Sequence, residues 1–506
     1  MEIRGVKVKK VKNLTKNPRF FVLRPPEYFS VPLLADDGDQ SIRAVNVNEK
    51  VKEGSLIGKP SGRYGSYVYS PCSGKVVSVV RKLNASGNEC EHVVIARDMS
   101  DEKEYFRPIG ELERDQENLL KRLYESGMVD NFSPFDPSYK KYLLKCKIKS
   151  LIINCTEDDP YLTAGSALLS TYPSEIIEGA KLLKTVANAE NLVFIFTSKQ
   201  KAVYKIIYNL LKKQNLQKQI RLKIYPDVYP LHDGRLIGYY ETGKMVPEGS
   251  RTAETSVIVD SVENCYDFFN AVTKGMPSTQ KAVSVAGNNC LRKANYFIKN
   301  GTSIEHILEI VGTKSEYEEN MLIYGGIMSG IAQETLDISA TLTASSILFV
   351  DSDEYTKDAE TACINCGRCV ACCPVRLHVK NLDDAIIDRN YNRAKKLGIE
   401  ACIGCGACSY VCPAKRYLAQ RISFAKDIVL GRRGKRPDSS EYVLVEGEDI
   451  RKTRGLAPDN LVEVSKDSSR EVSEVEKMLY ELSVKSKDEA KQSNVKNASG
   501  GNKNEQ

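Results

Sequence analysis

Long hydrophobic runs are missing from this sequence. No stretch of its 506 residues approaches the roughly 18 consecutive apolar residues of a membrane-spanning helix, so no such span is expected. The basic opening MEIRGVKVKKVKNL is not followed by an apolar segment of about 7–15 residues, which excludes a secretory signal. We therefore expect a chain that is made and kept in the cytoplasm.

Glycine is also missing at one informative place. The segment GMVDNFSPFDPSYKK (127–141) lies between a helix expected over 115–126 and a strand expected over 149–154. In a flavin- or nucleotide-binding protein this junction holds glycines, because the backbone has to approach a phosphate closely. This chain instead has Asp130, Phe132, Ser133, Pro134 and Phe135, which indicates that a phosphate-binding loop has been lost.

Neither sign of charge dominates. The 73 basic and 66 acidic residues leave a net charge of +7, which is typical of a solvated surface, and no nucleic-acid partner is expected. An alternative interpretation is that the excess assists docking to an anionic membrane or an acidic partner. Residues 430–506 are charged and poor in aromatic side chains, so we expect a largely disordered tail there.

The first half of the chain changes its pattern near residue 115. After an N-terminal segment over 1–30, residues 31–98 alternate like short hairpins. This pattern favours a lipoyl-like barrel-sandwich module, although the lysine-bearing tip that would carry biotin or lipoate is absent. We interpret the module as structural.

Strands and helices then alternate. Strands are expected over 191–198 and 220–226 as well as 149–154, and helices over 173–187 and 199–214. This order predicts a parallel sheet covered by helices, in an α/β domain over 115–250 whose ligands would bind at the carboxyl ends of strands. A small α+β module over 255–345 follows. The expected fold class is thus multidomain α/β and α+β.

The 15 cysteines are unevenly distributed, and nine of them lie between 363 and 412. Disulfide frameworks belong to short secreted chains, so metal ligation is the better interpretation. The motif C-x2-C-x2-C-x3-C-P occurs twice, which predicts two [4Fe–4S] clusters in a ferredoxin domain over 355–428. The other six are scattered singly and are expected to be small buried apolar residues: Cys72, Cys90, Cys146, Cys155, Cys265 and Cys290.

The spacing of each motif predicts the ligand sets. Three thiolates wrap one cube, and the fourth cysteine, beyond reach of that cube, ligates the other. The first cluster is therefore expected on Cys363, Cys366, Cys369 and Cys412. The second cluster is expected on Cys402, Cys405, Cys408 and Cys373. Zinc is the alternative, but zinc sites pair C-x2-C units into sets of four. Cys372 is a packed neighbour or an alternative ligand, and His378 a surface or packed residue.

Several motifs and the order of the modules resemble one family. They include the two cysteine motifs, DDPYLTAG (158–165), TGKMVPEG (242–249), GTSIEHIL (301–308) and YGGIMSG (324–330). From about 31 to 428 the chain resembles the C subunit of the Rnf ion-translocating ferredoxin:NAD⁺ oxidoreductase, the RnfC family. The resemblance implies an α/β domain similar to the flavin-bearing subunit of respiratory complex I, followed by a β-grasp module of the SLBB type.

The resemblance also locates what has been lost. The glycine-rich loop of the family cradles FMN and admits NADH, and its four glycines fall on Asp130, Phe132, Ser133 and Phe135. The positions after them correspond to Pro137, Ser138 and Lys141. Glycines are missing from two further loops, YPLHDGRLI (229–237) and SVENC (261–265), whereas acidic residues persist at Glu157 and Asp159. We expect an FMN/NADH site that is lost or re-purposed, with FMN in a rebuilt pocket as the alternative.

By resemblance the chain is an electron-transfer subunit of an ion-translocating complex. It would bind peripherally on the cytoplasmic side of the cell membrane through other subunits of an Rnf-type complex, and relay electrons through its two clusters. One alternative is a soluble carrier in the cytoplasm that delivers electrons to a reductase, as proline-reductase-associated members of the superfamily do. Another is a scaffold that only binds a redox partner protein. Whether the isolated chain is an enzyme stays open.

Overall fold

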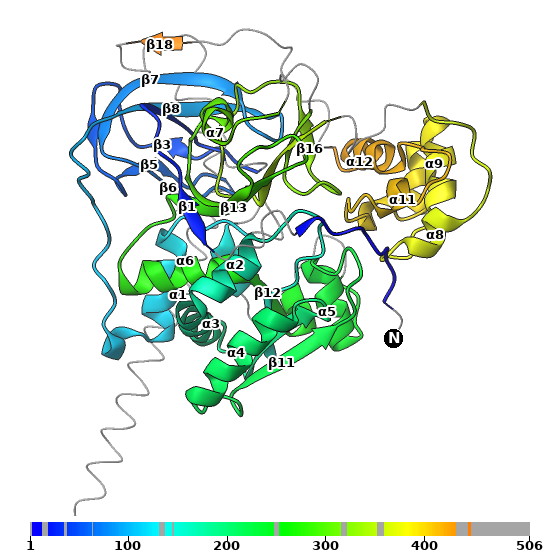
Figure 1. Cartoon of the computed structure of the whole chain (residues 1–506), viewed down its shortest axis with the longest axis horizontal. Helices are drawn as coiled ribbons and strands as arrows, with labels where there is room; N and C mark the ends of the chain where they lie inside the picture. The colour runs from blue at the N-terminus through cyan, green and yellow to red at the C-terminus, as the bar shows by residue number, and fades with distance from the viewer. Residues whose placement is uncertain are drawn as a thin grey trace, which may run out of the picture.

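The computed structural model describes residues 3–12, 19–34, 38–62, 64–130, 137–143, 146–246, 252–314, 321–351, 359–431 and 444–446. These residues form a β-sandwich module, an α/β domain, a mixed sheet and a small helical domain that holds the clustered cysteines (Figure 1). The expected multidomain α/β and α+β fold is confirmed. No helix in the described part of the chain is long and apolar enough to cross a membrane.

The β-sandwich module has two sheets around one core of alternating apolar side chains. The larger sheet is built on the long pair β7 (Gly74–Leu83) and β8 (Glu89–Arg97), joined by β2 (Tyr28–Pro32) and β4 (Lys50–Val51). The smaller sheet has the order β3 (Ile42–Arg43), β5 (Leu56–Lys59), β6 (Val68–Tyr69). Their shared core includes the fully buried side chains of Phe29, Val31, Ile57, Val93 and Ile95.

The α/β domain contains the parallel sheet that the alternating pattern predicted. Its strands have the order β11 (Ile220–Tyr225), β10 (Asn191–Thr197), β9 (Ser150–Asn154), β12 (Val257–Ser261), and each neighbouring pair is parallel. The helices are α1 (Gln116–Glu125), α2 (Ala164–Thr171), α3 (Pro173–Ala187), α4 (Lys201–Lys213), α5 (Gly234–Thr242) and α6 (Val262–Thr273). The expected helix over 173–187 coincides with α3, whereas α2 was not predicted.

Strand β12 and helix α6 belong to this sheet, although the sequence placed residues from 255 onward in the next module. The reason is physical: the apolar run Val257–Val259 needs a partner, and β9 offers an edge on which all three residues are buried. The junction expected between 250 and 255 is therefore not a boundary between sheets.

The third unit is a six-stranded mixed sheet that β1 (Phe20–Val22) joins from the start of the chain. The order is β1, β14 (Ala294–Lys299), β13 (Gln280–Ala286), β17 (Ser346–Val350), β15 (Met321–Tyr324), β16 (Ile331–Gln333). The amphipathic helix α7 (Ile304–Val311) buries Ile304, Ile307 and Val311 against it. This sheet adjoins the α/β domain, because Thr163 and Ala164 at the start of α2 donate hydrogen bonds to Ser284 of β13.

The helical domain lies at one side of the molecule in Figure 1. It comprises α8 (Arg368–Cys372), α9 (Val379–Ile387), α10 (Tyr391–Lys396), α11 (Ala407–Tyr410) and α12 (Leu418–Val429). Asp383 of α9 accepts hydrogen bonds of 2.7 Å from both Arg416 and Arg421, and so joins α9 to α12. Of the expected tail, the structure describes Leu430, Gly431 and β18 (Leu444–Glu446), which pairs antiparallel with β7; the rest lies outside the described residues.

Candidate functional site

The two cysteine motifs fold as two similar loop–helix units. In each unit a loop carries the first cysteines, a short helix (α8 or α11) follows, and the fourth cysteine lies at or just after its end. Cys363, Cys366 and Cys369 line a cavity of about 490 Å³, and Cys412 from the other motif lines the same cavity. Arg4 lines it as well, so a segment from the start of the chain reaches this place.

The remaining thiols gather beside this cavity in a more buried region. Cys373 is buried, while Cys402, Cys405 and Cys408 are half-buried. Burial, together with negative charge on Cys402, Cys373 and Cys372, raises the pKa of Cys405 to about 12. Such thiols need positive charge nearby to ionise. The irons of a cluster would supply that charge.

Backbone N–H groups point at the sulfurs of this second group. Leu377 donates to Cys373 Sγ at 3.3 Å, and Gly404 donates to Cys402 Sγ at 3.4 Å. Hydrogen bonds of this kind tune the reduction potential of an iron–sulfur cluster. Gly406 has a φ of +72°, and a β-carbon there would meet the carbonyl oxygen of Met328 at 2.2 Å. Glycine therefore allows the second loop to pack closely on the mixed sheet.

No group of three His, Cys, Asp or Glu side chains in the described residues converges closely enough for a single metal ion. Cys372 is buried and donates to the Cys369 carbonyl at 3.5 Å. His378 caps α9 by accepting from the Asn381 N–H at 3.4 Å, and it also lines the cavity.

The glycine-poor loop is only partly described, since Phe132, Ser133, Pro134 and Phe135 lie outside the described residues. Its two ends are held together, because Ser138 donates a backbone hydrogen bond of 2.9 Å to Met128. Asp130 is buried and accepts from Lys141 at 2.9 Å, and Lys141 also reaches Asp260 at 3.1 Å.

The ammonium and the two carboxylates of this network are paired with one another inside the protein. Burial alone lowers the pKa of Lys141, but Asp130 and Asp260 outweigh burial and leave that pKa above its ordinary value. Tyr142 donates to the other oxygen of Asp260. The ammonium of Lys141 is thus bound by two carboxylates of its own chain.

The helix N-termini at the carboxyl edge of the sheet are also occupied by the chain itself. Asp233 caps α5 by accepting from the N–H groups of Arg235 and Leu236, and Ser261 caps α6 by accepting from that of Asn264. On α2, the N–H of Ser166 donates to Glu157 at 2.8 Å. Free N–H groups at helix N-termini are what bind a phosphate, and here carboxylates and a hydroxyl accept from them.

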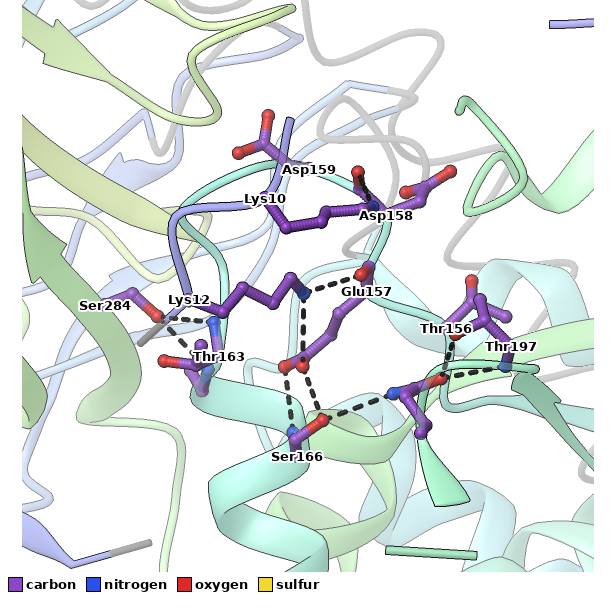
Figure 2. A network of polar contacts seen from close by, with 12 residues as sticks. Lys10, Lys12, Thr156, Glu157, Asp158, Asp159, Thr163, Ser166, Thr197 and Ser284 are labelled. Carbon is purple, nitrogen blue, oxygen red and sulfur yellow. Dashed lines mark hydrogen bonds and ion pairs between the residues drawn. The ribbon is translucent and has the colours of Figure 1, made fainter. Parts of the chain in front are cut away.

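Residues 3–12, which we call the strap, cross this edge of the sheet. Figure 2 shows Lys10 and Lys12 directed at the chain that follows β9. The Lys12 ammonium donates to the Glu157 carbonyl at 2.5 Å and lies 3.6 Å from its carboxylate, which Ser166 also contacts at 2.5 Å. Lys10 donates to the Asp158 carbonyl and lies 3.4 Å from Asp227. Sequence reasoning missed these two lysines.

His232 and Asp158 form a further pair at the same edge. His232 Nδ1 lies 2.6 Å from the Asp158 carboxylate, which also accepts from the His232 N–H at 3.1 Å. Burial alone lowers the pKa of His232, but Asp158 outweighs burial and raises it to about 9. The ring of Tyr229 lies beside this ring at a tilt of 44°, and its hydroxyl donates to the Cys405 carbonyl at 2.7 Å. The loop YPLHDGRLI (229–237) thus contacts the helical domain that holds the clustered cysteines.

Family models match successive parts of the chain. Residues 2–100 match the RnfC barrel sandwich hybrid domain, residues 133–269 the Nuo51 FMN-binding domain, and residues 355–413 a 4Fe-4S dicluster domain. The chain is 27% identical over 379 residues to the C subunit of the proton-translocating ferredoxin:NAD(+) oxidoreductase complex of Clostridium ljungdahlii. These matches support the RnfC family, which the sequence motifs resemble. The expected 4Fe–4S dicluster domain is thereby confirmed, and an electron relay is the role that such a domain supports.

Other RnfC relatives are similarly distant. The clostridial match covers 74% of this chain and 82% of the relative. The C subunit of the ion-translocating oxidoreductase complex of Citrobacter koseri is 28% identical over 355 residues, which cover 69% of this chain and only 50% of the relative. These relatives are named as subunits of complexes. Among solved structures, a chain of the NAD⁺-reducing [NiFe]-hydrogenase in the air-oxidised state is similar. The alignment covers 63% of this chain and 62% of the hydrogenase chain, with 13% sequence identity and a TM-score of 0.45.

Proposed function

We propose that this RnfC-family chain is the C subunit of an Rnf-type ion-translocating complex and relays electrons through two [4Fe–4S] clusters. The match to a 4Fe-4S dicluster domain supports the electron relay, and the relatives named as subunits of complexes support the assignment to a complex. The chain would attach to the membrane through partner subunits, on the cytoplasmic side. Its own contribution is to hold the two clusters close together and to present them to those partners.

One observation carries the proposal. Cys412 lines the same cavity as Cys363, Cys366 and Cys369, although it belongs to the other motif. This placement supports a first cluster on these four cysteines. Cys402 and Cys408 pack against the apolar core that contains Cys373, which supports a crosswise second cluster on Cys402, Cys405, Cys408 and Cys373. Crosswise ligation ties the two motifs into one folded unit.

The proposal includes no flavin. A bound FMN needs free N–H donors and a close backbone approach at its phosphate. In this chain the helix N-termini are capped by Glu157, Asp233 and Ser261, and Lys141 is held by two carboxylates. Asp130 adds negative charge where the phosphate would lie. The α/β domain would therefore serve as a platform for the ferredoxin domain.

Metal and sulfide analysis of the anaerobically purified full chain tests the relay. We expect about eight irons and about eight acid-labile sulfides per chain, because eight thiolates ligate two cubes. Zinc in place of iron would contradict the proposal. Copurification with membrane subunits, lost when the chain is washed with high salt, would support peripheral attachment.

A further inference from the structure

The strap contacts every part of the proposed electron path. Arg4 lines the cavity of the first cluster. Val6 is buried against Cys372 and Ala407 beside the second cluster, and Val8 packs on the same group together with Cys405. Lys10 and Lys12 then reach the edge of the parallel sheet (Figure 2). A continuous run of nine residues from 4 to 12 therefore reaches from the two cluster sites to the carboxyl edge of the parallel sheet.

Backbone hydrogen bonds hold the strap along this course. Val6 and Tyr229 exchange two N–H···O bonds of 2.9 Å, and Val11 donates to the Pro160 carbonyl at 3.0 Å. Gly5 has a φ of +153°, and a β-carbon there would meet the carbonyl oxygen of Tyr229 at 2.1 Å. The close approach of two backbones is possible because residue 5 is glycine.

The charges of the strap complement the acidic residues at this edge of the sheet. After β9, Glu157 and Asp158 present backbone carbonyls and buried carboxylates at the place where ligands of parallel sheets bind. Lys10 and Lys12 are the strap residues that meet them, while Lys7 and Lys9 on the same segment are exposed. Only two of the four lysines make these contacts, which indicates that the strap is held by specific side-chain positions and not by its net charge.

The two cluster sites differ in exposure. In the first site Cys363 and Cys366 are exposed, and Ile364 between them is 66% exposed. In the second site none of the four ligand cysteines is exposed. Val6, Tyr229 and Met328 cover that side, since they pack around Cys405 and Ala407.

We propose that the strap covers the carboxyl edge of the parallel sheet and seals the second cluster, so that the first cluster is the port for an external electron-transfer partner. This inference rests on the proposed two-cluster relay. An electron can pass between the clusters inside the domain, whereas exchange with a partner protein requires an exposed cluster.

Timed cysteine alkylation during iron removal tests the seal on the full chain. The anaerobic, iron-loaded protein is mixed with bathophenanthroline disulfonate, a bulky anionic iron chelator, then quenched at intervals with iodoacetamide and analysed by peptide mass spectrometry. In the wild type we expect Cys363 and Cys366 to be labelled before Cys405 and Cys408. If Cys363 and Cys366 were labelled at the same rate as Cys405 and Cys408 in the wild type, the proposed seal would already be overturned.

Two matched double variants test the role of the strap. Lys10→Ala/Lys12→Ala should speed labelling of Cys405 and Cys408 by about tenfold or more, because charged hydrogen bonds that hold the strap are lost. Lys7→Ala/Lys9→Ala removes the same charge from exposed positions and should behave like the wild type. Identical rates in the two variants would overturn the inference. The iron count before chelation is a separate readout: fewer than eight irons contradicts the relay, whereas eight irons with equal labelling contradicts only the seal.

Discussion

Replacing Lys141 by methionine should weaken the α/β domain strongly. The ammonium lies 2.9 Å from Asp130 and 3.1 Å from Asp260, and the three side chains are 8%, 10% and 1% exposed. Methionine keeps the apolar stem but removes the charge, so two buried carboxylates lose their common partner. Removing one partner of a buried ion pair costs about 3–5 kcal/mol of folding free energy. Asp260 keeps its bonds from Tyr142 and Asn264, which places the loss toward the lower value.

Hydrogen exchange resolved on strands β9 and β12 is the appropriate assay, because a chain of several domains does not unfold in one step. The expected loss corresponds to a fall in amide protection of between about two and four orders of magnitude. Asp130→Asn/Lys141→Met should recover part of the protection, since one buried charge is then removed. Lys147→Met is the matched control. Its ion pair with Glu190 lies on the surface, so protection should not change. Wild-type protection in Lys141→Met would refute the reasoning.

Three further outcomes are expected. Cys412→Ser should destroy the first cluster and spare the second, as judged by iron content and electron paramagnetic resonance. The control Cys372→Ser should keep eight irons. Selective loss of the second cluster in Cys412→Ser would show that ligation is not crosswise. Truncation after Gly431 should leave the visible cluster absorbance unchanged, and its collapse would mean that the tail supports the ferredoxin domain. His232→Gln should flatten the pH dependence of thermal stability. Folding raises the pKa of His232 from 6.5 to about 9, so its pairing with Asp158 stabilises the folded state fully below pH 6.5, and this contribution is lost as the pH rises through 9. A variant that still loses stability over this pH range would contradict the pairing.

Local sequence signals predicted the elements that depend on local chemistry. The helix over 173–187 matched α3 because proline at its first position and a regular apolar face define it. Helix α2 was missed, since AGSALLST contains glycine, serine and threonine, which lower helix propensity. Its N-terminus is fixed instead by Glu157, a contact made within the folded domain.

Contacts between distant segments could not be predicted. The sequence placed Asp130 where the family has a glycine, but it did not indicate that Lys141 and Asp260 would meet Asp130 in a buried network. The strap was likewise overlooked, because VKVKKVK looks like a basic, solvated stretch. Its alternation of valine and lysine was the available signal, since Val6 is buried while Lys7 and Lys9 are exposed.

Addition of NADH to the anaerobic, iron-loaded full chain tests the central claim most directly. The visible absorbance of the clusters is recorded first with NADH alone and then after dithionite. A relay without a flavin site predicts that NADH leaves the absorbance unchanged and that dithionite bleaches it. Bleaching by NADH in the absence of any partner would contradict the account, because it would require a working flavin and nucleotide site in the α/β domain.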